Sequence, residues 1–320
     1  MNVYMAETKK MRKIILDVDT GIDDSLALVY AALNPGIELL GVTCTYGNVE
    51  TIVGAQNTLD VLALAGRSDV PVCIGDSHAI NQKIFHRHEV STRIHGKNGV
   101  GQVCLPTSPV KPKKESAMDF LIYGMYTYQE DLTIVTTGPL TNLAKVILKD
   151  PSLKEWKGKV IMMGGALTVR GNVSHFAEAN ISQDPEAARL VLESGLDVTM
   201  VGLDVTMRSR LTQKDVDGWR QKQSQNGRLL ADMLTYYIQN TLGTGETYIH
   251  DPSAIICAIH PDFFTILPFF LTVETDGEDR GRIIVDHTRF RDRNPSTRIC
   301  LDVESEKVER ELWKVMHIGL

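Results

Sequence analysis

The sequence predicts an α/β protein built on an open, mostly parallel sheet with helices on both faces and a Rossmann-like core. Short apolar runs alternate with amphipathic stretches from residue 14 onward, which is the pattern of parallel strands joined by crossover helices. The chain has 320 residues, of which 43% are hydrophobic, so it can bury a large core. Since no repeat or linker interrupts the pattern, we expect a single domain over residues 1–320, with residues 1–12 as an N-terminal extension that can be disordered.

The predicted strands are short and apolar, and they are Ile14–Leu16, Ile37–Thr43, Val70–Ile74, Leu132–Thr136, Val160–Met163 and Val198–Leu203. Helix periodicity occupies the intervening segments, as in Ser25–Leu33 and Pro185–Leu192, which end at Pro and Gly stop signals. The tail adds strands within Phe269–Asp302 and a closing helix over Glu304–His317. Two polar segments, 78–114 and 240–249, break the rhythm, and we expect both to be mobile loops over a site.

Composition narrows the class of partner. A formal net charge of -6 argues against nucleic acid, because binding a polyanion requires a basic surface. The start of the chain lacks the apolar core of a signal peptide, and no segment approaches the about 18 apolar residues of a membrane span. The five cysteines are widely spaced and form no C-x-x-C pair, which suits a reducing compartment. We therefore expect a soluble, cytoplasmic protein that acts on small molecules, without a nucleic-acid or membrane partner.

Polar residues gather where the predicted strands end. Asp19 follows the first strand, Asn48 the second, Thr137 the fourth and Gly164 the fifth. Ligands of open α/β sheets bind at the carboxyl ends of the strands, so these residues should converge on one pocket.

The strongest motif is an apolar strand that runs into a cluster of four carboxylates, Asp17, Asp19, Asp23 and Asp24. So much negative charge costs folding energy unless a cation is present. Oxygen ligands select hard cations, and calcium accepts several carboxylates in irregular geometry. In the alternative reading, Asp23 and Asp24 only favour the start of a helix through its dipole. That reading leaves Asp17 and Asp19 unexplained.

Three further motifs carry candidate functional residues. His250-Asp251-Pro252 precedes an apolar helix, which Asp251 could simply cap. The stretch from Asn172 through Glu178 to Asn180 is rich in amides and carboxylate, although an ordinary polar loop has the same composition. His95 precedes a Gly-rich segment, where a solvated loop histidine is the usual explanation.

Together and in this order, the motifs resemble those of the inosine-uridine preferring nucleoside hydrolase family, over most of the chain. The family's D-x-D-x-x-x-D-D run is matched by Asp17 to Asp24. The other matching segments are Gly47-Asn48, Thr137–Asn142, Met163–Gly165, Glu178–Asn180 and His250-Asp251-Pro252.

The resemblance implies one calcium ion per chain and a ribonucleoside as substrate. The implied metal ligands are Asp19, Asp24, Asp251 and the main-chain carbonyl of Thr137. Asp19 is implied to be the general base that activates the metal-bound water. The implied sugar contacts are Asp23 and Asn180 at the 2'-hydroxyl, Asp251 and Asn48 at the 3'-hydroxyl, Asn172 and Glu178 at the 5'-hydroxyl, with Met163 also in the substrate site.

Cleavage of a glycosidic bond passes through an oxocarbenium-like state, which a field of carboxylates stabilises. The departing base needs a proton, and histidine is the natural donor near neutral pH. His250 is the first candidate and His95 the second. Tyr237 and Tyr248 are the candidates for a tyrosine that stacks on the base, as in some members of the family.

Two other functions compete with this hypothesis. A strand that ends in Asp17-Val18-Asp19 is also typical of haloacid dehalogenase-type phosphatases, but Gly21 occupies the fifth position and the paired Asp23-Asp24 would repel a phosphate. The second alternative is a non-catalytic nucleoside or calcium binder, which would have no need to retain the expected base and acid. The choice between purine and pyrimidine stays open. The resemblance further implies a homodimer or homotetramer that works in nucleoside salvage or catabolism.

Overall fold

The computed structural model describes residues 11–221, 224–289 and 291–319. The extension expected over residues 1–12 therefore lies almost wholly outside the described part. A central sheet of eight strands has the order β3-β2-β1-β4-β5-β6-β12-β9, and β9 alone runs antiparallel to its neighbour. In that order, the strands are β3 (Val72–Ile74), β2 (Ile37–Cys44), β1 (Arg12–Val18), β4 (Leu132–Thr136), β5 (Lys159–Met163), β6 (Asp197–Val201), β12 (Thr297–Val303) and β9 (Phe264–Pro268).

The core lies on both faces of this sheet. Along β1, Ile14, Leu16 and Val18 contact one apolar cluster, whereas Ile15 contacts a second cluster on the opposite face. Successive side chains of a strand point to opposite faces, so a strand covered by helices on both sides must be apolar throughout. This is why the first strand is a continuous apolar run in the sequence.

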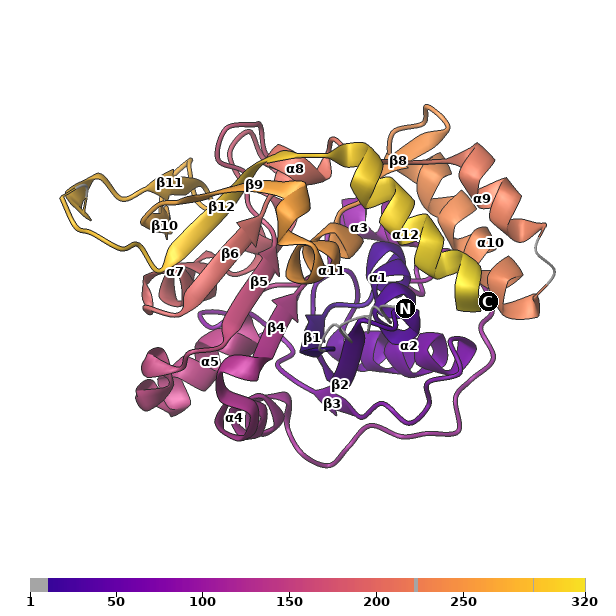
Figure 1. Ribbon diagram of the computed structural model, residues 1–320, viewed down its shortest axis with the longest axis horizontal. Helices are drawn as coiled ribbons and strands as arrows, with labels where there is room; N and C mark the ends of the chain where they lie inside the picture. The colour runs from indigo at the N-terminus through magenta and orange to yellow at the C-terminus, as the bar shows by residue number, and fades with distance from the viewer. Residues whose placement is uncertain (1–10, 222–223, 290, 320) are drawn as a thin grey trace, which may run out of the picture.

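Two groups of helices cover the sheet, and Figure 1 shows the sheet between them. The first apolar cluster includes side chains of α1 (Ile22–Leu33), α2 (Thr51–Leu64), α9 (Gln213–Arg220), α10 (Gln225–Asn240), α11 (Asp251–Ile259) and α12 (Ser305–Gly319). The second includes side chains of α4 (Ala117–Tyr128), α5 (Thr141–Lys149) and α7 (Pro185–Glu193). The predicted α/β class, with a mostly parallel sheet and helices on both faces, is confirmed.

Smaller elements surround the ends of the strands. They are the antiparallel pairs β7 (Arg210–Thr212) with β8 (Glu246–Tyr248) and β10 (Leu271–Val273) with β11 (Ile283–Val285), the helices α3 (Glu89–His95), α6 (Ala179–Gln183) and α8 (Leu203–Thr206), and the 3-10 turns η1 (Gln129–Asp131), η2 (Pro151–Glu155), η3 (Pro261–Phe263) and η4 (His287–Arg289).

The segments expected to be loops carry some of this structure, since α3 lies within 78–114 and β8 within 240–249. The strand expected to run to Leu203 ends at Val201, because Gly202 is the N-cap of α8.

The strand order places a switch point between β1 and β4. From β1 the chain first builds the sheet outward through β2 and β3, and it then returns to build from β4 on the other side. The connections therefore diverge at the carboxyl ends of β1 and β4, which leaves a crevice there. The residues that follow these two strands are Asp19 and Thr137.

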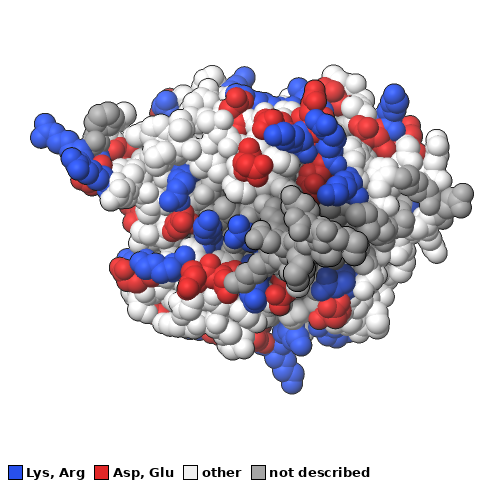
Figure 2. Space-filling model, in the orientation of Figure 1, with Lys and Arg blue, Asp and Glu red and all other residues white. Residues whose placement is uncertain are grey.

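The outer surface mixes charges of both signs. On the face shown in Figure 2, Lys and Arg side chains lie among Asp and Glu side chains. Ion pairs of the chain include Arg298–Asp197 and Arg208–Asp302. Such interspersed charge is typical of an ordinary solvated surface. None of the helices in the described ranges combines the length and the apolar character that a membrane span requires.

Candidate active site

The connection from β1 to α1 holds the acidic residues in place. Gly21 is the N-cap of α1, and its main-chain N–H donates to Asp24 Oδ2 at 2.9 Å. A Cβ atom at Gly21 would lie 2.6 Å from His95 Nδ1, so only glycine allows this close packing. Asp23 and Asp24 occupy the first turn of α1, where the helix dipole favours negative charge. Asp23 and Asp24 therefore do favour the start of a helix, as the alternative explanation held. That role does not explain why further carboxylates lie beside them.

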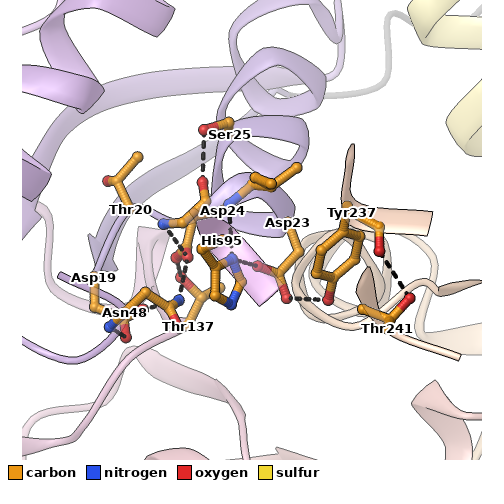
Figure 3. A network of polar contacts seen from close by, with 12 residues as sticks. Asp19, Thr20, Asp23, Asp24, Ser25, Asn48, His95, Thr137, Tyr237 and Thr241 are labelled. Atoms are coloured by element: carbon orange, nitrogen blue, oxygen red, sulfur yellow. Dashed lines mark hydrogen bonds and ion pairs between the residues drawn. The ribbon is translucent and has the colours of Figure 1, made fainter. Parts of the chain in front are cut away.

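Hydrogen bonds tie the ends of three strands to this cluster, as Figure 3 shows. Thr137, after β4, donates its hydroxyl to Asp24 Oδ1 at 2.6 Å. Asn48, after β2, donates its main-chain N–H to Asp19 Oδ2 at 2.8 Å and its amide group to Asp24 Oδ2 at 3.1 Å. The expected convergence of residues that follow separate strands is therefore observed.

Asp23, Asp24 and Asp251 form a compact acidic group. Each offers a carboxylate oxygen, and these oxygens lie within 4.8 Å of one another. Burial raises the pKa of Asp23 and of Asp24 to about 6. Burial, followed by repulsion from neighbouring carboxylates, raises the pKa of Asp251 well above its usual range. Buried like charges at this distance require either protons or a cation.

The same group passes a chemical test for a metal site. Asp23 Oδ1 and Asp251 Oδ2 are buried and have no hydrogen-bond partner among the described residues. Unpartnered carboxylate oxygens in an all-oxygen environment are the donors that hard cations prefer. The group could therefore hold a metal ion. Asp19, one of the expected ligands, lies outside this tight group, but it shares Asn48 with Asp24 and its pKa is also raised, first by burial and then by repulsion from Asp24.

An amide and a carboxylate form the opposite wall. The Asn180 amide group donates to the Thr137 carbonyl at 2.7 Å and to the Met163 carbonyl at 3.2 Å. A carbonyl oxygen has two lone pairs, so the Thr137 oxygen can still accept another partner. Glu178 caps α6 and accepts main-chain N–H groups with both oxygens, including that of Gly165 at 2.9 Å. Asn172 is exposed, and its Oδ1 accepts from the main chain of α6.

The two histidines are buried rather than solvated. His95 is the last residue of α3 and is 6% exposed, so the alternative explanation as a solvated loop histidine is wrong. The Ile22 N–H donates to His95 Nδ1 at 3.1 Å. This nitrogen therefore carries no proton, and its 3.8 Å distance from Asp23 Oδ1 is not an ion pair. Burial lowers the pKa of His95 and of His250 to about 4, so both rings are neutral at pH 7.

The acidic group and the amide wall enclose a cavity of about 420 Å³. The predicted site residues that line it are Asp23, Asn48, His95, Thr137, Met163, Asn172, Glu178, Asn180, His250 and Asp251. Asp19 and Asp24 have no exposed surface and lie behind this wall, bound to Asn48. Asp251 is in the first turn of α11, while His250 holds the N-cap position, so Asp251 is not the helix cap that its position in the sequence allowed.

Further lining residues come from segments that the sequence reasoning left open. Tyr237 of α10 and Tyr248 of β8 both line the cavity, as does Thr241, one helical turn beyond Tyr237. The Tyr237 hydroxyl donates to Asp23 Oδ2 at 3.0 Å. Thr206 of α8 was missed entirely, although its Oγ1 lies 2.8 Å from His250 Nδ1. The signal for it was the Asp204-Val205-Thr206 stretch directly after β6, where polar residues at a strand end approach the site.

The fold and the site define an α/β enzyme with one acidic, oxygen-lined pocket at the switch point of its sheet. The sequence matches the family described as inosine-uridine preferring nucleoside hydrolase over residues 14–310. The chain belongs to this family, and it is an N-ribohydrolase that acts on the N-glycosidic bond of ribonucleosides. The resemblance drawn from the motifs is thereby confirmed.

Several named proteins are similar to this chain. Uridine nucleosidase 1 of Arabidopsis thaliana is 38% identical over 319 residues, which cover 95% of this chain and 94% of that protein. The pyrimidine-specific ribonucleoside hydrolase RihA of Klebsiella pneumoniae is 32% identical, covering 92% of this chain and 94% of that protein. Among solved structures, the purine-preferring ribonucleoside hydrolase from Gardnerella vaginalis has a TM-score of 0.93 and 42% identity, covering 95% of this chain and 98% of the other.

Proposed function

We propose that the protein hydrolyses ribonucleosides to ribose and a free base with one calcium ion bound at the acidic group. The observation that carries this proposal is the trio of buried carboxylates with oxygens within 4.8 Å, two of which lack a hydrogen-bond partner. A protein has no folding reason to bury three like charges so closely. A bound divalent cation would neutralise this negative charge and so explain why the three carboxylates are buried together.

The proposed ligands are Asp19, Asp24, Asp251 and the Thr137 carbonyl. Asp24 is already oriented by Thr137 and Gly21. Asp251 offers one carboxylate oxygen close to Asp24, and its Oδ2 has no hydrogen-bond partner among the described residues. When bound, calcium supplies a Lewis acid that holds ribose hydroxyls and makes a water molecule more acidic. Carboxylates and carbonyls with irregular spacing suit calcium better than magnesium, which demands near-octahedral geometry.

Asp19 is the proposed general base. Two donors of Asn48 fix its carboxylate, at 2.8 Å and 3.3 Å. Burial, followed by repulsion from Asp24, raises the pKa of Asp19, so this carboxylate is a better proton acceptor than an exposed aspartate. Asp19 would take a proton from the attacking water, which then adds to C1' of the ribose.

The carboxylates have a second role in the transition state. Positive charge develops on the ribose ring as the base leaves, and the negative charge of Asp23, Asp24 and Asp251 beside the cavity would stabilise it. His250 lies on the cavity wall and is the proposed donor to the departing base; its neutral ring would stabilise the developing negative charge by a hydrogen bond from its N–H, without giving up the proton. His95 is the second candidate, although its Nδ1 is committed to Ile22.

The remaining polar groups of the cavity match a ribose. Asp23 keeps Oδ1 free for the 2'-hydroxyl while Tyr237 holds its Oδ2, and Asn180 lines the same cavity on its opposite wall. Asn48 and Asp251 are assigned to the 3'-hydroxyl. The 5'-hydroxyl is assigned to Asn172 and Glu178, and Met163 completes the substrate wall.

The biological setting is proposed on more general grounds. One sheet with an apolar cluster on each face supports a single domain over the chain. The five cysteines are all free thiols, which suits the cytoplasm. A homodimer or homotetramer and a role in nucleoside salvage or catabolism rest on the family alone.

The test is incubation with uridine, cytidine, inosine, guanosine and adenosine, in calcium and after thorough chelation, following the release of ribose. Similar proteins are named for uridine, for pyrimidines and for purines, so both classes of base must be included. Ribose release that needs calcium supports the proposal. Ribose release that persists at the same rate after chelation overturns the metal assignment, and the absence of ribose release with every nucleoside overturns the function.

A further inference from the structure

The hydrogen bond between Thr206 and His250 is the feature of the site that the mechanism above does not use. Thr206 Oγ1 lies 2.8 Å from His250 Nδ1, and the threonine side chain is buried, with 1% of the residue exposed. His250 lines the cavity. A histidine ring with Nδ1 bound behind the wall can offer only its other nitrogen, Nε2, to a substrate.

Both partners are held in place by elements that the fold fixes independently. Thr206 ends the short helix α8, whose Asp204 accepts the main-chain N–H groups of Leu167 and Thr168 at 3.0 Å and 2.7 Å. His250 follows β8, which pairs with β7, and the Ile249 N–H continues this pairing by donating to Ser209 at 3.1 Å. Hydrogen bonds from main-chain N–H groups thus fix the position of Thr206 on one side and of His250 on the other.

The direction of this hydrogen bond follows from the number of available partners. A threonine hydroxyl has one proton to donate. Among the described residues, His250 Nδ1 is the only hydrogen-bond partner found for Thr206 Oγ1. If the hydroxyl accepted a proton from Nδ1, its own proton would be buried without an acceptor, which native structures avoid. The hydroxyl therefore donates and Nδ1 accepts.

We infer that Thr206 is a positioning residue that holds the His250 ring with Nδ1 as an acceptor and the ring proton on Nε2, the nitrogen that is left to face the cavity. This inference rests on the proposed role of His250 as the donor to the leaving base. Without the Thr206 hydroxyl, the His250 ring would also populate the tautomer with its proton on Nδ1 and other ring rotations. In those states an unprotonated nitrogen faces the leaving base, which needs a hydrogen-bond donor. Outer partners of functional histidines typically change activity by about 10- to 100-fold when they are removed.

The experiment compares Thr206→Val, which removes the hydroxyl, with Thr206→Ser, which keeps it. Thr199→Val, at a buried threonine of β6 outside the cavity lining, is the matched control for a buried Thr→Val change. We expect kcat for uridine and inosine to fall about 10- to 100-fold in Thr206→Val, with KM within about threefold. Hydrolysis of p-nitrophenyl riboside, whose leaving group needs no proton, should change less than about threefold. Thr206→Ser should recover most of the activity.

A second measurement reads the tautomer without catalysis. In protein labelled with ¹⁵N-histidine, the ring nitrogen shifts of His250, assigned by their loss in His250→Gln, should show a protonated Nε2 in the wild type and in Thr206→Ser. A protonated Nδ1 in the wild type overturns the inference. Equal losses on nucleosides and on the nitrophenyl riboside also overturn it, because they indicate a binding or folding role. Failure of the wild type to cleave any nucleoside would instead refute the proposed function.

Discussion

Replacing Asp251 with asparagine should have opposite effects on stability with and without calcium. The change keeps the shape of the side chain and removes one of three carboxylates that lie within 4.8 Å of one another. In chelator, Asp251→Asn should melt at a temperature equal to or above that of the wild type, because a repulsive charge is gone. In calcium the order should invert, because the variant loses a ligand.

The magnitude follows from the geometry. Two unit charges 4.8 Å apart repel by about 3 kcal/mol at an effective dielectric constant of about 20. Part of this repulsion is already relieved by protonation of Asp251 itself, since burial and then repulsion from the neighbouring carboxylates raise its pKa well above its usual range. The negative charge of Asp251 also favours the first turn of α11, so its removal reduces the gain in stability by about 0.5 kcal/mol more. A net gain of about 1 kcal/mol without metal corresponds to a rise in Tm of about 2–4 °C.

Calcium acts in the opposite direction. A ligand at about 100 times its Kd stabilises the folded state by about 2.7 kcal/mol, which corresponds to about 5–10 °C for the wild type. Asp251→Asn should lose most of this shift. The assay is thermal unfolding of both proteins in EDTA and across a calcium titration, at neutral pH.

Asp184→Asn provides the matched control. Asp184 is also a buried aspartate at a helix N-terminus, but it lies outside the acidic group and accepts hydrogen bonds from Thr141 Oγ1 and from the N–H groups of Ile80 and Ala187. The free energy of unfolding of Asp184→Asn should fall by about 2 kcal/mol both in calcium and in chelator, because an amide group cannot accept all of these hydrogen bonds. The reasoning would be refuted if calcium raised the Tm of Asp251→Asn as much as that of the wild type. It would also be refuted if Asp251→Asn lost as much stability in chelator as Asp184→Asn.

Three predictions concern catalysis. Asp19→Ala should lower kcat by several orders of magnitude, since a base and a ligand are lost together, while circular dichroism shows a folded protein; turnover above about a tenth of the wild-type rate would exclude Asp19 from the mechanism. His250→Ala should slow uridine and inosine by about 10²-fold or more but spare p-nitrophenyl riboside, and equal losses would indicate a binding role. Deoxyuridine and deoxyinosine should have kcat/KM about 10⁴-fold below the ribonucleosides, because Asp23 and the metal lose a buried partner; comparable efficiency would contradict the ribose contacts.

The sequence by itself determined the features that depend on local pattern. Apolar runs of strand length predict strands covered on both faces, because a strand in that position has no solvated side, and Ile14 and Ile15 indeed contact opposite clusters. The position of Asp19 and Thr137 at strand ends predicts their convergence, because parallel strands present their carboxyl ends at one edge. Glycine signals, turn residues and the acidic run are also local, and they were sufficient to indicate the family.

Only the tertiary structure decided which groups meet across long stretches of chain. The resemblance implied that Asp251 and Asp24 meet, but the residue pattern alone does not, since more than 200 positions separate them in the sequence; the structure shows that Asp23 joins them in one group. His95 could have been an ordinary solvated loop histidine, because its neighbours are glycine-rich, and only the structure excludes this alternative: α3 packs it against the first turn of α1, where burial makes it neutral. Thr206 gave no strong local signal, since a threonine hydroxyl acquires its role from the nitrogen it faces, and that nitrogen belongs to His250, brought close by the β7–β8 pairing.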